Sequence, residues 1–353
     1  MQKLSRYIST VIAASILLVL LVLLGFYAIG AMIDEMGNLQ QQYDFTAALW
    51  FVFYSIPGNV FDLLPFATLV GCLAGLGTLA NNSELVVIRS AGVSTSRVVW
   101  MVMRPAILIM AAGMMITEYI APYSESIAQS ERAIALRKSE NVVSRQGLWH
   151  REGNQFMHFS VVQPNGVLYG VTIYSFDKKR RLLNTLYAER AIYQRDHWLL
   201  EDVLESRPKD GGIEGEAVLS KVWSTDVSPE LLNLLVLDPV HLSIYGLWQY
   251  SGYLESQGLN NGPYRLAFWK KVLQPLSTVT LVLIAISFVF GPLREVTMGF
   301  RIFVGVLVGI VFKTAQDMLA PASMVYGFQP VYASLVPILI CLMIGVWLLH
   351  KAR

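Results

Sequence analysis

The chain has 353 residues, of which 54% are hydrophobic and 15% are charged. Soluble domains use roughly 45–50% apolar and about 25% charged residues, so this composition indicates an integral membrane protein. The formal net charge of +2, without Lys- or Arg-rich blocks, argues against nucleic acid as a partner. Cys72 and Cys341 both lie in apolar runs, which leaves neither a disulfide framework nor a cysteine metal site.

Six apolar stretches are long enough to cross a membrane, because a bilayer core about 30 Å thick needs roughly 20 helical residues. In chain order, spans are expected over residues 7–33, 50–80, 98–121, 272–290, 300–320 and 331–349. The second stretch contains Pro57 and Pro65, which predict a kinked or interfacial first third. An even number of spans places both chain termini on one side of the membrane.

Basic residues identify that side as cytoplasmic. Near the membrane they gather on the side of the termini, as Lys3, Arg6, Arg89, Arg97, Arg294, Arg301, Lys351 and Arg353. The short loops 34–48 and 321–330, on the other side, contain neither Lys nor Arg. Because cytoplasmic loops carry the excess of Lys and Arg, both termini are expected in the cytoplasm and the segment after the third span outside it.

A short polar insert separates the second and third spans. Asn82 or Ser83 is placed to cap a helix, and Glu84 lies in its first turn, where the helix dipole favours a carboxylate. Gly92 is placed to end it. We therefore predict a helix over about residues 82–92.

The same insert is amphipathic. Leu85, Val86 and Ile88 supply an apolar side. Glu84 and Arg89 project polar heads, so the insert can lie at the membrane surface and dock a cytoplasmic protein. An ordinary amphipathic surface loop fits the pattern equally well.

Between the third and fourth spans the composition changes to that of a β-rich domain. Strands are expected over residues 155–162, 167–176, 182–193, 198–205 and 217–227, separated by turn-forming clusters. This spacing predicts a sandwich or barrel, followed by a helix over residues 243–256. The chain then has three parts: spans over 1–121, an exported β domain with flanking helical segments over 122–263, and spans over 264–353.

The exported domain is rich in apolar side chains that alternate toward one face. Phe159 and Ile173 are examples of inward positions, and we expect an interior or seam able to receive acyl chains. A free strand edge would also allow addition of a partner's strand.

Two further patterns lie within the spans. Small residues at four-residue spacing, Gly71 with Gly75 and Gly305 with Gly309, allow helices to approach closely, either within the chain or across a subunit interface. Lys313, Gln316 and Asp317 share one face of the fifth span. Lys313 and Asp317 either neutralise each other or line a polar cavity, since an unpaired charge in lipid costs roughly 2.5–3.5 kcal/mol.

Several functions are excluded by missing motifs. The sequence contains no phosphate-binding GxxxxGK[ST] loop, no GxGxxG after a strand, no HExxH and no GxSxG, and its five histidines lack ligand spacing. No cofactor and no metal are expected, and a transport role would need ATP hydrolysis by a partner.

Several motifs spread over the chain are shared with one family. They are Ser83-Glu84-Leu85-Val86-Val87, Gln146-Gly147-Leu148-Trp149, Trp198-x-Leu200, Lys271-x-x-x-Pro275-Leu276 and Phe290-Gly291-Pro292-Leu293-Arg294. With them the whole chain resembles the LptF/LptG permeases of the lipopolysaccharide-export ABC transporter of Gram-negative bacteria. Met298-Gly299-x-Arg301 and Val325-Tyr326-Gly327-x-x-Pro330 are similar to the LptG branch of that family.

The resemblance implies a six-span permease of the inner membrane with a periplasmic β-jellyroll. It implies a heterodimer with an LptF-like subunit, a cytoplasmic LptB-like ATPase pair, an LptC-like periplasmic bridge protein and lipopolysaccharide as cargo. Ser83, Glu84, Leu85 and Arg89 would then couple to the ATPase. The family pattern has basic residues near the outer end of the first span, whereas this chain has Asp34 and Glu35 there.

Contacts to an anionic lipid head must therefore come from elsewhere. Arg132 and Lys271 match basic positions of the family, and Lys313 with Asp317 lies deeper in the fifth span. These four residues are the candidate substrate-binding set, because Arg suits bidentate and Lys point-charge contacts with phosphate.

Two other classes of function remain as alternatives. A secondary transporter would show inverted similarity between its two triplets of spans, and none is evident. A membrane-anchored β-domain scaffold would tolerate apolar replacement of Lys313 and Asp317.

Overall fold

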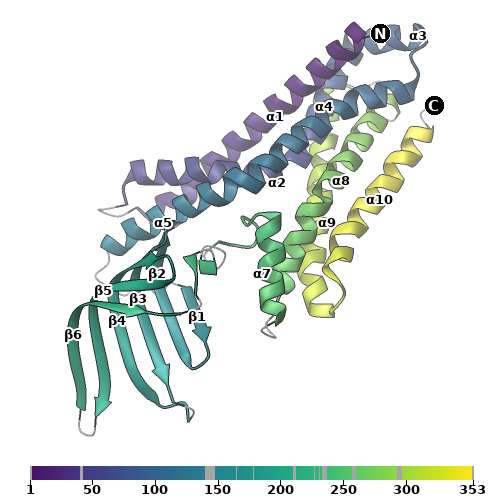
Figure 1. Cartoon of the computed structure of the whole chain (residues 1–353). Helices are drawn as coiled ribbons and strands as arrows, with labels where there is room; N and C mark the ends of the chain where they lie inside the picture. The colour runs from purple at the N-terminus through teal and green to yellow at the C-terminus, as the bar shows by residue number, and fades with distance from the viewer. Residues whose placement is uncertain are drawn as a thin grey trace. The chain divides into compact units, whose positions relative to one another are not determined.

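A computed structural model describes residues 2–39, 43–139, 148–163, 165–177, 179–209, 212–225, 227–229, 231–232, 237–256, 260–291 and 296–351, without the side chains of residues 89 and 137–139. The chain divides into two compact units (Figure 1). Unit 1 comprises Met1–Gly30, Ile56–Ala121 and Pro239–Arg353, and unit 2 comprises Ala31–Ser55 and Pro122–Asp238.

Six helical runs in the described residues are long and apolar enough to cross a membrane, which confirms the predicted class of fold. Five are single helices: α1 (Gln2–Met36), α2 (Phe45–Asn81), α8 (Gly262–Phe290), α9 (Met298–Tyr326) and α10 (Pro330–Lys351). The third run joins α4 (Thr95–Met115), the π-helical turn η1 (Ile116–Ile120) and α5 (Ala121–Ser139). Two shorter helices are α3 (Glu84–Ser90) and α7 (Ile244–Ser256).

Helix α9 differs from the prediction of a loop over residues 321–330. It continues through Pro321 and ends where Gly327 adopts the left-handed conformation, with φ of 72°. A proline is tolerated inside a membrane helix because neighbouring groups can satisfy the carbonyl it leaves without a donor.

The small-residue pairs pack helices within this chain. A Cβ atom on Gly71 would lie 2.6 Å from the Cα of Ile16, and one on Gly75 would lie 2.9 Å from Ile12 Cδ1, so α1 and α2 touch at these glycines. A Cβ on Gly305 would lie 2.3 Å from Leu73 Cδ1. Of the two alternatives left open by the sequence, these contacts favour packing inside the subunit.

Gly309 extends the contact between α9 and α2. A Cβ there would lie 2.7 Å from Cδ1 of Phe66, which leaves no room for a larger residue unless that ring moves. Gly305 and Gly309 therefore hold α9 against α2 over about one turn.

Two prolines inside helices leave carbonyls that neighbouring helices satisfy. Pro105 has no N–H for the carbonyl of Met101, and the hydroxyl of Ser9 on α1 donates to that oxygen at 3.0 Å. Pro65 likewise frees the carbonyl of Phe61, to which Gln274 Nε2 on α8 donates. Without water, such a carbonyl needs a partner, so these bonds fix which helices pack together.

Unit 2 contains a six-stranded antiparallel sheet in sequential order, β1-β2-β3-β4-β5-β6. The strands are β1 (Leu148–Glu152), β2 (Gln155–Gln163), β3 (Val167–Phe176), β4 (Leu182–Gln194), β5 (His197–Lys209) and β6 (Gly212–Trp223). The described strands thus form one sheet, in which β1 and β6 are the edge strands.

The largest differences from the expected strands concern β1, β6 and the end of β5, which extends to Lys209 and not to residue 205. Strand β1 was not predicted, because His150, Arg151 and Glu152 give it little apolar or β-branched character. Strand β6 was expected over 217–227 but begins at Gly212, because its polar first half pairs with the end of β5. Tertiary pairing overrides the weak strand propensity there.

Replacing Ser9 by alanine removes the donor to the Met101 carbonyl, so we expect a loss of about 1–3 kcal/mol of stability. In a chain that also carries Pro105→Ala, the restored backbone N–H can bond this carbonyl, and the cost of Ser9→Ala should fall below about 1 kcal/mol. Thermal unfolding of the full chain in detergent measures all four members of this cycle. If Ser9→Ala cost the same stability with Pro105 and with Pro105→Ala, the Ser9 hydroxyl would not be replacing the missing donor to the Met101 carbonyl.

Candidate functional site

A polar pocket lies within unit 1 among helices α2, α8 and α9. Its lining residues are Asp62, Pro65, Phe66, Lys270, Gln274, Ser277, Phe312, Lys313 and Gln316. The pocket is built where Pro65 interrupts the hydrogen bonding of α2 and Gln274 reaches across to the freed carbonyl. A backbone irregularity held by a neighbouring helix therefore forms one wall of the pocket.

Asp317, one residue beyond Gln316, is shared by two lysines at this pocket. Lys270 Nζ lies 3.2 Å from Asp317 Oδ1, and Lys313 Nζ lies 3.3 Å from Oδ2. All three side chains are partly exposed, from 32% for Lys270 to 48% for Lys313. The sequence predicted the pair one turn apart on α9 but not that Lys270, which approaches from α8, shares its carboxylate. Asp62 on α2 lines the same pocket, so its formal charges balance, but both ammonium groups remain partly exposed and could meet an anionic group.

Lys271 is next to Lys270 in sequence but has a different role. It is 4% exposed, and its ammonium donates to the carbonyl of Leu242 at 2.6 Å. Glu118 in η1 accepts the backbone N–H groups of Ile244 and Tyr245 at 2.8 and 3.2 Å. These contacts fix the N-terminus of α7 against α8 and η1, so this geometry gives Lys271 a structural role.

Arg132 is bound within unit 2. Its Nε lies 3.0 Å from a carboxylate oxygen of Glu35, and its guanidinium lies over the ring of Phe51 at 5.4 Å. Tyr43 and Asn38 donate to the same carboxylate. Arg132 is 24% exposed, so an anionic ligand would have to compete with Glu35 for it. The acidic residue that departs from the family pattern is thus the partner of the predicted cation.

Helix α3 differs in part from the predicted amphipathic insert. Leu85 and Ile88 are buried, each 6% exposed, whereas Val86 and Val87 are 56% and 64% exposed. The three residues of the predicted apolar side thus divide between two faces, because Leu85 and Ile88, three positions apart, share the face toward the bundle. Val86 and Val87 give α3 an exposed apolar patch, which suits docking of a protein.

The first-turn carboxylate and the C-terminal glycine of α3 agree more closely with the prediction from the sequence. Glu84 begins the helix and accepts hydrogen bonds from Tyr7 and Asn82, both at 3.3 Å. Ser83 has φ of +60° and Gly92 has φ of +80°. Gly92 ends the helix region as predicted, whereas the left-handed Ser83 is not in the extended conformation usual for an N-cap. The side chain of Arg89 lies outside the described residues.

Arg301 is a functional candidate that sequence reasoning counted only as a cytoplasmic charge and a motif residue. It is 2% exposed, and its Nη1 donates to the carbonyl of Gly77 at 3.3 Å and to Asn81 Oδ1 at 3.4 Å. A Cβ on Gly77 would lie 3.3 Å from the same nitrogen. The beginning of α9 is thereby attached to the end of α2, directly before α3.

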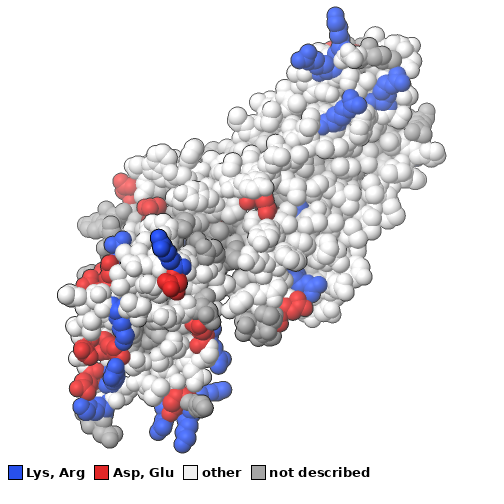
Figure 2. All heavy atoms as spheres, viewed as in Figure 1, with Lys and Arg blue, Asp and Glu red and all other residues white. Residues whose placement is uncertain are grey.

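Charges in unit 1 are distributed unevenly (Figure 2). Basic side chains gather at the end that carries α3 and both termini. The surface along the middle of the long helices shows almost no charge. The exposed basic residues at that end include Lys3, Arg6, Arg97 and Lys351. This is the distribution on which the expected cytoplasmic position of the termini depends.

Phe159 and Ile173 lie in the interior of the β domain. They are 0% and 4% exposed and belong to one hydrophobic cluster with Trp198 and Trp223. Trp198 Nε1 donates to the carbonyl of Val227 at 2.8 Å, so the segment after β6 covers this end of the cluster. Both inward positions are therefore packed against the protein's own side chains.

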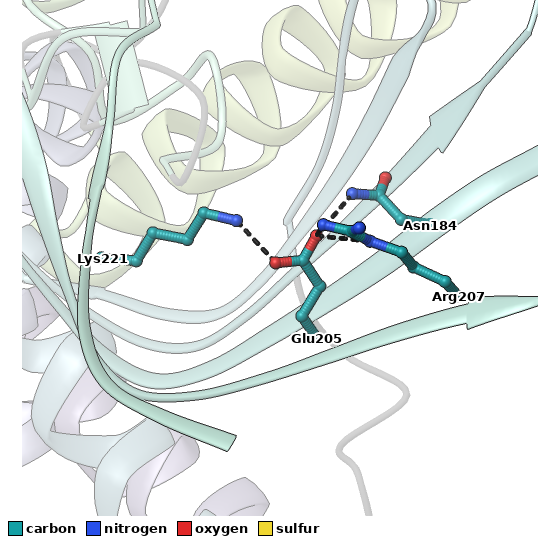
Figure 3. Close-up of polar contacts among 4 residues, drawn as sticks. All are labelled: Asn184, Glu205, Arg207 and Lys221. Carbon is teal, nitrogen blue, oxygen red and sulfur yellow. Dashed lines mark hydrogen bonds and ion pairs between the residues drawn. The ribbon is translucent and has the colours of Figure 1, made fainter. Parts of the chain in front are cut away.

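A buried carboxylate, Glu205, lies on the same domain (Figure 3). It is 7% exposed and accepts hydrogen bonds from Lys221 at 2.6 Å, from Arg207 at 2.9 Å and from Asn184 at 3.1 Å. The hydrogen bond from Lys221, followed by those from Arg207 and Asn184, lowers the pKa of Glu205 from 4.5 to about 2.

Because its pKa is lower in the folded state, Glu205 stabilises the β domain above about pH 4.5. This contribution is lost as the pH falls toward 2, and it amounts to at most about 3 kcal/mol. We expect Glu205→Gln to remove it, so that the variant's sensitivity to pepsin between pH 4.5 and 2 changes less than that of the parent. Identical pH profiles would show that Glu205 is not ionised preferentially in the folded chain.

The shared carboxylate predicts unequal effects of single substitutions in the polar pocket. Asp317→Leu leaves two lysines unpaired, and we expect a loss of roughly 1.5–3 kcal/mol. Lys313→Met leaves the pair of Lys270 and Asp317 intact and should cost under about 1 kcal/mol. Thermal unfolding in detergent compares the stabilities of the two variants. Equal losses would contradict the sharing of the Asp317 carboxylate by the two lysines.

Comparison with known proteins agrees with this architecture. The family described as lipopolysaccharide export system permease LptF/LptG matches residues 6–351. The lipopolysaccharide export system permease protein LptG of Escherichia coli K12 is 38% identical over 354 residues, which cover 99% of this chain and 98% of the relative. The protein of the same name from Haemophilus influenzae is 34% identical over 355 residues, covering 100% and 99%. The chain therefore belongs to the LptF/LptG family of lipopolysaccharide export permeases.

Proposed function

We propose that this chain is an LptG-type permease half of an ABC transporter that extracts lipopolysaccharide from the outer leaflet of the inner membrane. The single observation that carries the proposal is the pocket among α2, α8 and α9 in which two partly exposed lysines share Asp317. A phosphorylated sugar head would meet the two ammonium groups there, and its acyl chains would remain among apolar side chains. The named activity of the relatives supports the same cargo.

The depth of the pocket fits this role. Lys313 follows Arg301 by twelve residues on α9, which corresponds to about 18 Å along the helix. If the end with Arg301 is cytoplasmic, Lys313 lies past the midplane of a bilayer core about 30 Å thick. The pocket then opens at the level of the outer leaflet, and the β domain lies in the periplasm.

The energy must come from a partner, and α3 is its proposed docking element. An LptB-like ATPase pair would contact the exposed Val86 and Val87 and the Glu84 carboxylate on the cytoplasmic side. Leu85 and Ile88 hold α3 against the bundle, and Arg301 attaches α9 to the helix that leads into α3. An LptF-like subunit would complete the permease, and an LptC-like protein would receive cargo from the β domain.

Reconstitution tests the proposal directly. The chain is purified with its permease and ATPase partners into vesicles that contain lipopolysaccharide, and ATP-dependent transfer to a periplasmic acceptor protein is measured. We expect transfer by the parent complex and at least a tenfold reduction in the Lys313→Met variant with the ATPase still bound. No ATP-dependent transfer by the parent would refute the function.

Coupling through α3 has a separate test with a control on the same helix. Glu84→Ala should reduce ATPase copurification or uncouple hydrolysis from transfer, because a charge-assisted contact contributes about 1.5–3 kcal/mol. Ser90→Ala, which removes only a hydroxyl bonded to the Val87 carbonyl, should leave both unchanged. Full association and transfer by a Glu84→Lys variant would exclude Glu84 from the docking surface.

A further inference from the structure

The sheet of the β domain is folded along one line. On five consecutive strands the register skips residues that lie opposite one another: Ser160, Gly170, Glu189, Asp202 and Leu219. Two of them have left-handed backbones, with φ of 60° at Gly170 and 53° at Asp202. Regular pairing resumes on both sides of this row, so the row is a crease where the pleat is interrupted.

The crease divides the sheet into two halves. The long half contains residues 155–159, 171–176, 182–188, 203–209 and 212–218, and the short half contains 161–163, 167–169, 190–194, 197–201 and 220–223. The rings of Phe159 and Trp223 lie 6.3 Å apart, although three strands separate β2 from β6. The halves therefore face each other across a shared core.

This core is filled in the present structure. Met157 and Phe159 of the long half, and Trp198 and Leu200 of the short half, are each 0% exposed and belong to one cluster. An acyl chain can enter only if side chains of the two halves separate, because protein interiors leave few voids of that size. The crease is the natural hinge, since backbone pairing is already interrupted there.

One ion pair connects the two halves at the polar edge of the core. Glu205 belongs to the long half, as do its partners Arg207 and Asn184, whereas Lys221 belongs to the short half. Figure 3 shows Lys221 approaching the carboxylate from the side opposite to Arg207 and Asn184. The contact between Lys221 and Glu205 thus spans the fold, whereas the other two contacts stay within one half.

We propose that the Lys221–Glu205 ion pair is a clasp that keeps the folded sheet closed, and that an anionic amphiphile opens it by taking the place of Glu205 on Lys221. The proposal rests on the proposed function, which brings a phosphorylated lipid to this domain. Lys221 is 40% exposed, so a phosphate can reach it, whereas Glu205 keeps Arg207 and Asn184 as partners when Lys221 leaves. When a phosphate replaces Glu205 on Lys221, both the ammonium of Lys221 and the carboxylate of Glu205 therefore keep a partner.

Spin-label distances in the full chain test the clasp without any cargo. Both native cysteines are replaced by alanine, and labels are placed at exposed Leu183 in the long half and exposed Gln194 in the short half. We expect Lys221→Met to increase the population with longer distances at least threefold, and Lys221→Arg to keep the parent distribution. A reference pair within the long half, Leu183 with Leu204, should not change in either variant.

The same labels test opening by the amphiphile. Lipopolysaccharide added to the parent chain in a neutral maltoside detergent should lengthen the distance between Leu183 and Gln194, and the reference pair should stay constant. Lys221→Met, which has no ammonium to offer, should show no further change. An unchanged distribution in Lys221→Met, or no response of the parent to lipopolysaccharide, would overturn the proposal.

Tethering separates this proposal from the proposed function. A bis-maleimide joins Lys221→Cys to Glu205→Cys across the fold, and a control tether joins Leu204→Cys to Ala217→Cys, which are exposed and paired within the long half. In the reconstituted complex, the tether across the fold should reduce ATP-dependent transfer of lipopolysaccharide at least tenfold, and the control tether less than twofold. Transfer that is equal with both tethers would refute the clasp but leave the function standing. Absence of transfer in the untethered parent would refute the function, and the spin-label distances would still decide on the clasp.

Discussion

The transmembrane unit depends on one constraint: a backbone carbonyl inside the membrane must have a hydrogen-bond donor. Prolines within the helices remove such donors, and two of the freed carbonyls are bonded by side chains of other helices, Ser9 for Met101 and Gln274 for Phe61. Each bond both permits an irregular helix and determines its neighbour. Apolar packing alone gives helices in lipid little preference for one neighbour over another, so these polar links and the close contacts at glycine specify the bundle.

The same reasoning explains where charge is tolerated. The cations Lys271 and Arg301 are nearly fully buried, and each donates to backbone or amide oxygens that hold two elements together. Lys270 and Lys313 instead share the single carboxylate of Asp317 and remain partly exposed. A charge in a bundle is costly, and here the two lysines lie beside Asp317 and near Asp62, which lines the same pocket. The partial exposure of both lysines distinguishes this cluster from the buried Lys271 and Arg301.

The sequence predicted the elements better than the site. Hydrophobic runs revealed the six spans, and runs of β-forming residues revealed five of the six described strands, because both patterns are local. The partners of Lys270 and Arg132 could not be predicted from local patterns, since Asp317 and Glu35 are 47 and 97 residues away. The crease was also hidden, because Gly170 is its only glycine and Asp202 reads as an ordinary strand residue. The division of the apolar residues of α3 into a buried face with Leu85 and Ile88 and an exposed Val86 was not predicted, because a helix of seven residues is too short for its periodicity to be read from sequence.

Helix α9 connects the two places that the proposed transport cycle must link. Arg301 attaches its first turn to Gly77 and Asn81 at the end of α2, and Gly305 and Gly309 hold the next turns against Leu73 and Phe66. Lys313 and Asp317 then follow on the same helix, opposite the part of α2 that Pro65 interrupts. Along this whole distance α2 and α9 are in contact. Gln274 on α8 donates to the Phe61 carbonyl of α2, so α8 is linked to the same pair at the pocket. The three helices that line the pocket are therefore connected to one another and, through the end of α2, to the beginning of α3.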